Sequence, residues 1–340
     1  MHLPHRSLAA LAASALGASL LLTAAPPAQA APVFTDADSF IYGTNSSHDD
    51  GTCVEVENNG PTTQTPVVEN GPATNYSTFA SSSHTGVGLD TATGSSQVSG
   101  SASIKSANGL PTTMDFAASG TATATFAQAP SACEVHSYSE LQTYAKFTLT
   151  QAGVMHLTTK GLGKGVFGQV QVYADADDSY LNVQGSGSRF TGTAEVFLPA
   201  GVYWFYATAG PEVQTSTAKS VSGSVTAHAE FHAAGSQTQA VSGKGKKYVT
   251  LPTARTCATH AVSSSITGKK KRANQIKQVT FFVNDAKVKK VKTPDKGDVV
   301  TVPVADDQAA DVVAEVKLFP KKKGKPGKVV EVSASYEACS

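Results

Sequence analysis

The sequence is poor in charge, in aromatic side chains and in tryptophan. Charged residues make up 16% of the 340 residues, aromatic residues make up 7%, and there is one tryptophan. Long segments with apolar residues at helical spacing are absent, whereas glycine, serine, threonine and alanine are abundant. Short runs that alternate small or apolar residues with polar ones are typical of strands. The sequence therefore argues against a helical bundle and predicts an all-β protein.

The sequence motifs of common enzymes are also missing. There is no G-x-S-x-G nucleophile elbow, no HExxH pair and no glycine-rich phosphate loop followed by Lys-Ser or Lys-Thr. We therefore expect a non-enzymatic protein without a cofactor. A secreted hydrolase, whose acidic or histidine residues meet only in the folded chain, is the third functional alternative.

The first thirty residues have the three parts of a secretory signal peptide. A short basic region with His2, His5 and Arg6 precedes an apolar core, and Ala28-Gln29-Ala30 offers small residues for cleavage. No other apolar run approaches the roughly 18 residues that a membrane span needs. We therefore expect a secreted, extracellular or cell-surface-associated protein with no membrane span.

The four cysteines fit an oxidising compartment. An exported chain with an even number of cysteines usually oxidises them, and four cysteines allow three pairings. Two cysteines lie in each half of the chain. We therefore expect the two disulfides to be Cys53–Cys133 and Cys257–Cys339.

Charge divides the chain into two parts of opposite sign. Residues 31–235 carry 6 basic and 17 acidic residues, a net charge of −11, whereas residues 236–340 carry 20 and 9, a net charge of +11. The length exceeds what one hydrophobic core usually organises. We therefore predict an acidic domain over 31–235, a Gly-, Ser- and Gln-rich linker over 236–250, and a basic domain over 251–340.

The acidic domain contains three characteristic segments, "FTLTQAGVMHLT", "DADDSYLNV" and "LPAGVYWFYAT". In these segments it resembles the bacterial pre-peptidase C-terminal module, a jelly-roll-like β-sandwich of secreted proteins. The resemblance implies apolar strands that turn at glycine and an acidic loop before a Tyr-Leu strand. The apolar residues on either side of Ala152-Gly153 predict a hairpin at that turn.

The basic domain has six short alternating strands, with a cysteine near each end: "YVTLP", "CATHAVSSSI", "QIKQVTFFVND", "VVTVPV", "ADVVAEVKLFP" and "VVEVSASYEAC". In this pattern it resembles the bacterial Ig-like modules. The fold class that we predict is thus all-β, with two β-sandwich domains, a jelly-roll-like one followed by an Ig-like one.

Two lysine-rich loops give the strongest functional signal. In an Ig-like sandwich the B–C and F–G loops emerge at the same end, which would gather these cations at one tip. Such a tip attracts polyanions, and we expect an extracellular or cell-wall polyanion as partner, with nucleic acid as another polyanion to consider. The alternative is a lysine-rich surface that serves solubility. The candidate residues are Lys269, Lys270, Lys271 and Arg272 in the first loop, and Lys321, Lys322, Lys323, Lys325 and Lys328 in the second.

The most aromatic strand of the chain has two interpretations. In "VYWFYA", alternation puts Trp204 and Tyr206 on one face and Tyr203 and Phe205 on the other. The strand is either packed on both faces or exposes an aromatic wall for carbohydrate. The second interpretation makes these four residues candidates for a carbohydrate-binding module, the runner-up function.

Two segments offer metal ligands. Asp175, Asp177 and Asp178 could bind a structural calcium ion, although the loop lacks the glycine and the final glutamate of an EF-hand. On one face of a later strand, Glu230 lies two residues from both His228 and His232, so that either pair could bind zinc. The alternative for each segment is an ordinary solvated surface without a metal.

Overall fold

The computed structural model describes residues 32–48, 53–59, 62–86, 90–128, 131, 133–175, 180–320 and 325–340. The expected signal peptide lies outside these residues. Within them, regular structure is almost entirely strand, and the helical elements are short: α1 (Lys270–Ala273) and the 3-10 turns η1 (Lys244–Lys247) and η2 (Cys257–Thr259). None of the helices in the described part of the chain is long and apolar enough to cross a membrane. The prediction of an all-β fold is confirmed.

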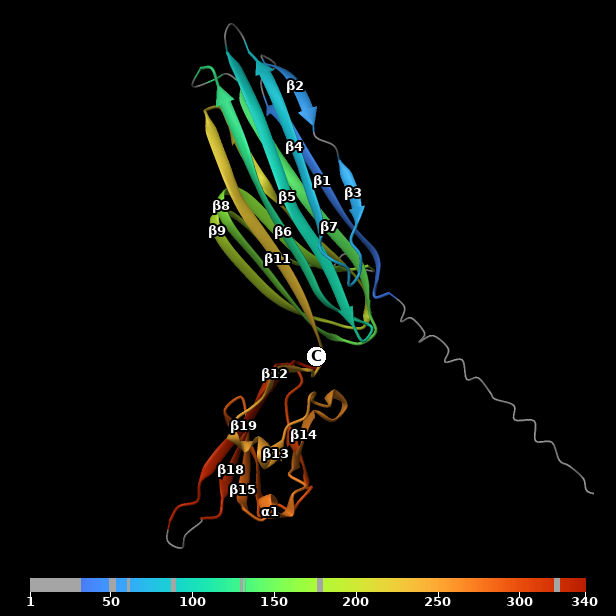
Figure 1. The fold of residues 1–340 in the computed structure, drawn as a ribbon, viewed down its shortest axis with the longest axis vertical. Coiled ribbons are helices and arrows are strands. Elements are labelled where there is room, and N and C mark those ends of the chain that lie inside the picture. Colours follow the sequence, from blue (N-terminus) through green and yellow to red (C-terminus); the bar gives the residue numbers. More distant parts are fainter. Residues whose placement is uncertain are drawn as a thin grey trace, which may run out of the picture. The chain divides into compact units, whose positions relative to one another are not determined.

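The first eleven strands form one antiparallel sheet (Figure 1). Their order in the sheet is β2-β4-β5-β6-β11-β8-β10-β7-β1-β3, and β9 pairs with β8. Their bounds are β1 Phe34–His48, β2 Val54–Asn59, β3 Thr63–Pro66, β4 Thr74–Thr85, β5 Thr91–Ala107, β6 Leu110–Phe126, β7 Glu134–Leu149, β8 Gly153–Ala174, β9 Tyr180–Leu198, β10 Gly201–Thr215 and β11 Lys219–Ala233.

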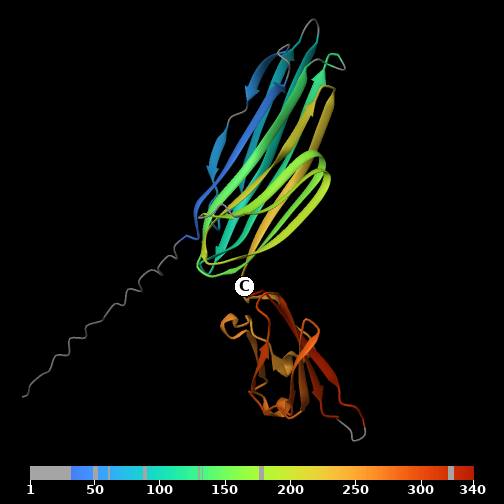
Figure 2. The ribbon, with the colours of Figure 1, turned by 180° about the vertical axis from the view of Figure 1, so that it is seen from behind.

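Strand β8 allows this sheet to fold back on itself. Its first half pairs with β11 and its second half, from Val166, pairs with β10. Gly163 and Gly165 lie between the halves with φ of +124° and +62°, a conformation that favours glycine. The curvature of β8 and β9 is visible in Figure 1 and Figure 2. Buried residues of β4, β5, β6 and β11 share one core with those of β7 and β10, as two facing layers.

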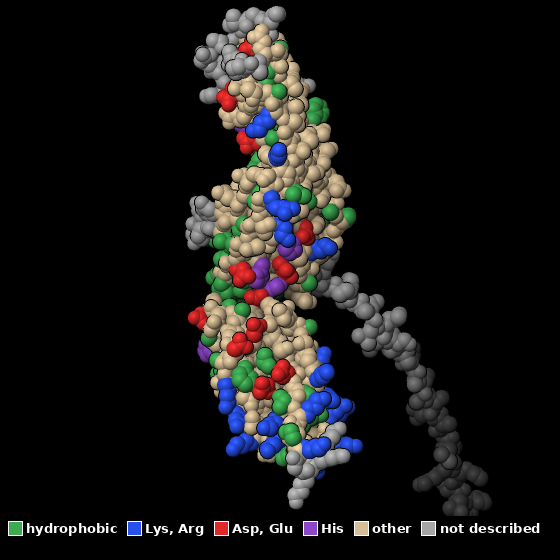
Figure 3. Space-filling model, turned by 90° about the vertical axis from the view of Figure 1, so that its left-hand side faces the viewer, with side chains coloured by type: hydrophobic (Ala, Val, Ile, Leu, Met, Phe, Trp, Pro, Cys, Tyr) green, Lys and Arg blue, Asp and Glu red, His purple; other side chains and the backbone are tan. Residues whose placement is uncertain are grey.

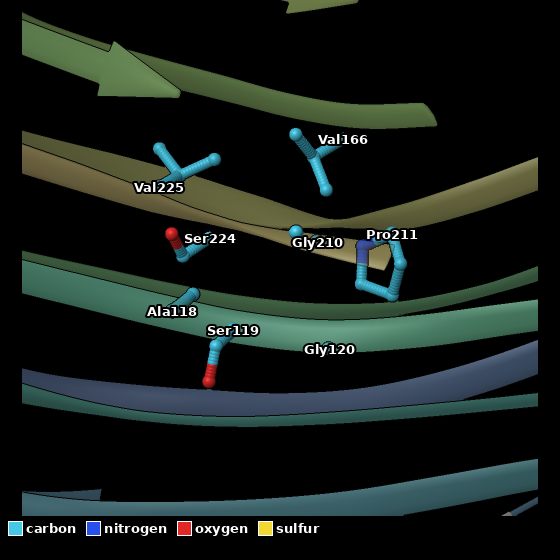
Figure 4. Close-up of a pocket in the computed structure, with 9 residues that line it drawn as sticks. Ala118, Ser119, Gly120, Val166, Gly210, Pro211, Ser224 and Val225 are labelled. Atoms are coloured by element: carbon cyan, nitrogen blue, oxygen red, sulfur yellow. The ribbon is translucent and has the colours of Figure 1, made fainter. Parts of the chain in front are cut away.

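Small residues hold these layers close together. Ser96 on β5 and Ser139 on β7 are 2.6 Å apart between their Oγ atoms, although the two strands are not neighbours in the sheet. A Cβ atom on Gly120 would lie 2.9 Å from Pro211 Cγ of β10, and the space that these residues line (Figure 4) is too narrow to admit a water molecule. The abundance of glycine, serine and alanine therefore reflects a thin sandwich.

The remaining strands form two sheets that share a second core. The sheets are β12-β19-β18-β15-β16 and β13-β14-β17, and buried residues of both belong to one cluster. The third, fifth and sixth predicted strands pair within one sheet, and the second and fourth pair within the other. The specific resemblance to Ig-like modules stays a prediction. The bounds are β12 Gln237–Ser242, β13 Val249–Thr250, β14 Ala261–Ile266, β15 Ile276–Val283, β16 Ala286–Lys292, β17 Val299–Pro303, β18 Ala310–Leu318 and β19 Val329–Tyr336.

The segment 236–250 differs from the linker that the sequence predicts. It contains β12, η1 and β13, and β12 pairs with β19. Tyr248 and Val249 are buried in the second core. The Gly-, Ser- and Gln-rich composition is explained by the position of β12, because an exposed edge strand has little need of apolar side chains.

Both predicted disulfides are confirmed. Cys53 is bonded to Cys133 and Cys257 to Cys339, with Cα–Cα distances of 5.8 and 5.5 Å. Each bridge therefore lies within one half of the chain. The specific resemblance of the first domain to the pre-peptidase C-terminal module stays a prediction.

Candidate binding sites

The structure places the two lysine-rich connections next to each other. Lys269, Lys270 and Lys271 are exposed at α1, between β14 and β15, and Arg272 is half-buried. Lys325 and Lys328 are exposed in the β18–β19 connection. Lys and Arg side chains gather at this end of the second sandwich (Figure 3). Lys321, Lys322 and Lys323 lie outside the described residues.

A backbone hydrogen bond joins the two connections. The amide of Phe319, directly after β18, donates to the carbonyl oxygen of Gln275, directly before β15, at 2.8 Å. The amide of Leu318 donates to the carbonyl oxygen of Lys328, also at 2.8 Å. The β18–β19 connection is thereby fixed beside α1 at the root of both loops.

A groove of about 820 Å³ lies between these connections. We call it the basic groove and define it by Lys247, Tyr248, Phe319, Lys325 and Lys328. Tyr248 is buried, and Lys247 Nζ lies 5.2 Å from the centroid of its ring. Phe319 remains 45% exposed. The groove thus combines three cations with an accessible aromatic ring, and no Asp or Glu is among the described residues that line it.

The four aromatic candidates of β10 divide between core and surface. Tyr203 and Phe205 are buried and belong to the first core, so the sequence-based assignment of these two residues to a carbohydrate site is wrong. Tyr203 Oη donates to the carbonyl oxygen of Pro199 at 2.9 Å, which fixes the turn before β10. Trp204 and Tyr206 are half-buried on the opposite face of the strand.

Neighbouring strands add two more rings around Trp204. The ring of Tyr173 on β8 lies 6.4 Å from that of Trp204 at an interplanar angle of 12°, and the ring of Tyr144 on β7 lies 6.0 Å away. Lys146 Nζ is 5.0 Å from the Trp204 ring. We call Tyr144, Tyr173, Trp204 and Tyr206 the aromatic face. Tyr144 and Tyr173 could not be predicted from the sequence, because only the strand register places them beside Trp204 and Tyr206.

The described part of the predicted calcium loop contacts the aromatic face. Asp175 Oδ1 accepts a hydrogen bond from Trp204 Nε1 at 2.6 Å and lies 3.0 Å from Lys146 Nζ. The hydrogen bonds from Trp204 and Lys146 lower the pKa of Asp175. Asp177 and Asp178 lie outside the described residues. Calcium binding by this loop therefore stays a prediction.

The histidines of β11 belong to a wider cluster than the sequence indicated. His232 Nε2 lies 2.9 Å from Glu230 Oε1, whereas His228 Nδ1 is 2.7 Å from Asp115 Oδ1 on β6. Two further residues join His232: His156 on β8 and Glu337, which follows β19. Glu337 Oε1 lies 3.1 Å from His156 Nε2 and 2.7 Å from His232 Nδ1. His side chains lie among Asp and Glu side chains on the face drawn in Figure 3.

The electrostatics of this cluster are dominated by hydrogen bonds. The hydrogen bond to Glu337, opposed by burial and aided by Glu230, raises the pKa of His232 to about 9. Burial alone would raise the pKa of Glu337, but the hydrogen bonds from His156 and His232 outweigh it and lower this pKa to about 2. The hydrogen bond to Glu337 also raises the pKa of His156 against the effect of burial. The carboxylate of Glu337 is therefore held in its charged form.

Comparison with known proteins does not show a family for this chain. No protein-family model matches the chain. No curated protein matches it either. Among solved structures, it is similar to the adhesin domain of Epf from Streptococcus pyogenes, with 10% sequence identity and a TM-score of 0.19 over 58% of this chain and 75% of that chain. A likeness at this TM-score carries no argument about function.

Proposed function

We propose that this is a secreted, non-catalytic binding protein whose basic groove binds an extracellular polyanion. The observation that carries the proposal is the composition of the groove, in which exposed Phe319 lies among Lys247, Lys325 and Lys328. The two disulfides support an oxidising, extracellular environment. The partner is a polymer with repeated phosphate or carboxylate groups.

The clustering of lysines around the groove has an electrostatic cost. Like charges held close together repel, and exposed lysines contribute little to fold stability. A polyanion relieves this repulsion and gains affinity by releasing its condensed counterions. The ring of Phe319 adds an apolar contact for the uncharged part of a repeating unit, such as a sugar ring. The groove therefore offers both charge neutralisation and ring packing, which a surface kept only for solubility does not need.

The first test is the salt dependence of binding. Residues 32–340 are titrated with poly(glycerol phosphate), and with uncharged dextran as control, in 50 and 200 mM NaCl. If each of the three groove lysines neutralises one phosphate, affinity for the anionic chain should fall roughly 40-fold over this range. An affinity that does not change with salt, or no binding at 50 mM NaCl, contradicts the proposal.

A matched pair of variants separates the groove from general charge. The triple variant Lys247→Ser, Lys325→Ser and Lys328→Ser removes the three cations of the groove and should weaken binding at least about 10-fold. The control variant Lys287→Ser, Lys289→Ser and Lys290→Ser removes the same charge from edge strand β16 and should change affinity much less. Phe319→Ala should weaken binding about 5-fold or more without changing the salt dependence. Equal losses of affinity in both triple variants would show that the polymer is attracted to positive charge in general and not to the groove.

The aromatic face supports a second candidate function, binding of neutral carbohydrate. The specific observation is the pair of nearly parallel rings of Tyr173 and Trp204 on a half-exposed sheet surface. Stacking on sugar persists at high salt, in contrast to polyanion binding. Under this second function, Trp204→Ala would abolish binding to a neutral polysaccharide, and the triple variant at Lys247, Lys325 and Lys328 would retain it.

A further inference from the structure

Three metal-ligating side chains from separate parts of the chain converge at one point. His156 comes from β8, His232 from β11, and Glu337 from the segment after β19. Their ligand atoms all lie within 4.8 Å of one another. The two imidazole rings are 4.8 Å apart between centroids. Zinc bonds of about 2.0–2.1 Å in tetrahedral geometry place ligand atoms about 3.3 Å from one another.

We propose that His156, His232 and Glu337 bind one zinc ion. His156 supplies Nε2, His232 supplies Nδ1 and Glu337 supplies a carboxylate oxygen, because these are the atoms that face each other. Two imidazoles and one carboxylate suit zinc, whereas calcium and magnesium prefer oxygen ligands alone. Three protein ligands leave a fourth position for water.

The opposite nitrogen of each imidazole already has the partner that a metal-bound histidine needs. His156 Nδ1 lies 3.0 Å from Glu195 Oε1 of β9, and His232 Nε2 lies 2.9 Å from Glu230 Oε1. Such outer carboxylates fix the ring orientation and the tautomer, and they strengthen the imidazole as a ligand. The cluster therefore has both the ligands and their supports, with each histidine turned toward Glu337 by a carboxylate behind it.

The backbone around Glu337 is fixed where the ion would bind. Its amide donates to the carbonyl oxygen of Ser236 at 2.8 Å, and the amide of Gly235 donates to the carbonyl oxygen of Ala338 at 3.0 Å. Ser236 follows His232 by only four residues, and the Cys257–Cys339 disulfide holds the same segment. Glu337 itself is buried, whereas the histidines are 27% exposed and leave a path for the ion to enter.

Zinc binding is measured on residues 32–340 after treatment with a chelator. Isothermal titration at about pH 8 with zinc chloride should give one ion per chain, and calcium chloride should give no binding at this site. His156→Ala and His232→Ala should each reduce zinc affinity by more than 100-fold. Glu195→Gln removes only the outer partner of His156 and should reduce zinc affinity about 10- to 100-fold. Far-ultraviolet circular dichroism checks that each variant is folded.

His228→Ala is the matched control, because His228 lies on the same strand and is also paired with a carboxylate, that of Asp115. It should bind zinc as the unmodified protein does. Glu337→Gln keeps the size and the backbone contacts of the residue while removing its charge, and it should also lose affinity. Absence of zinc binding, or full retention of binding in both His156→Ala and His232→Ala, overturns the proposal.

Discussion

At the scale of single residues, neighbouring side chains on β10 have opposite roles. Phe205 is 1% exposed and lies in the first core, whereas Trp204 is half-buried and bonds to Asp175. Alternation alone predicted which of these side chains share a face. It could not predict which face is covered, because that depends on the opposing layer of the sandwich, whose strands lie far away in the sequence.

These positions predict a clear difference in stability. Phe205→Ala should lower the free energy of unfolding of the first domain by about 3–5 kcal/mol, as for a large aromatic side chain removed from a core. Trp204→Ala loses one hydrogen bond and surface ring contacts, and should cost about 2 kcal/mol or less. Urea unfolding followed by circular dichroism measures both. A cost for Trp204→Ala as large as that for Phe205→Ala would contradict the assignment of Trp204 to the surface.

At the scale of elements, the sequence located most strands but not their partners. The strand, turn, strand pattern around Ala152-Gly153 is present, since β7 ends at Leu149 and β8 starts at Gly153. The hairpin predicted there is wrong, because β7 pairs with β1 and β10 while β8 pairs with β9, β10 and β11. The core of a sandwich forms between two layers. It can therefore form whether or not strands that are consecutive in the sequence pair with each other.

Small residues between the layers give the second stability prediction. Gly100→Ala should destabilise the first domain by about 1–3 kcal/mol, because its Cβ atom would lie 2.1 Å from the Ala117 carbonyl oxygen and 2.6 Å from Leu141 Cδ2. Gly201→Ala is the matched control, since its Cβ atom would meet only Tyr203 at 3.4 Å or more. Thermal unfolding compares the two. If both variants are equally stable, the layers are not as close as described.

At the scale of the whole molecule, the sequence predicted what depends on local composition and missed what depends on distant pairs. The disulfides, the opposite net charges and the neighbouring lysine-rich connections followed from counting, spacing and the Ig-like resemblance. The sequence did not predict the exposed ring of Phe319, the rings around Trp204 or the approach of Glu337 to His232. Glu337 is 105 residues from His232, and no pattern in the sequence joins them.

The most direct test of the central claim is to locate a bound polyanion. Hydrogen–deuterium exchange is measured on residues 32–340 in 50 mM NaCl, with and without poly(glycerol phosphate). If the polymer binds in the basic groove, exchange becomes slower at residues 247–248, 274–275 and 325–328, with β16 and the first domain unchanged. Slower exchange on the aromatic face or along β16, with none at the groove, would contradict this claim.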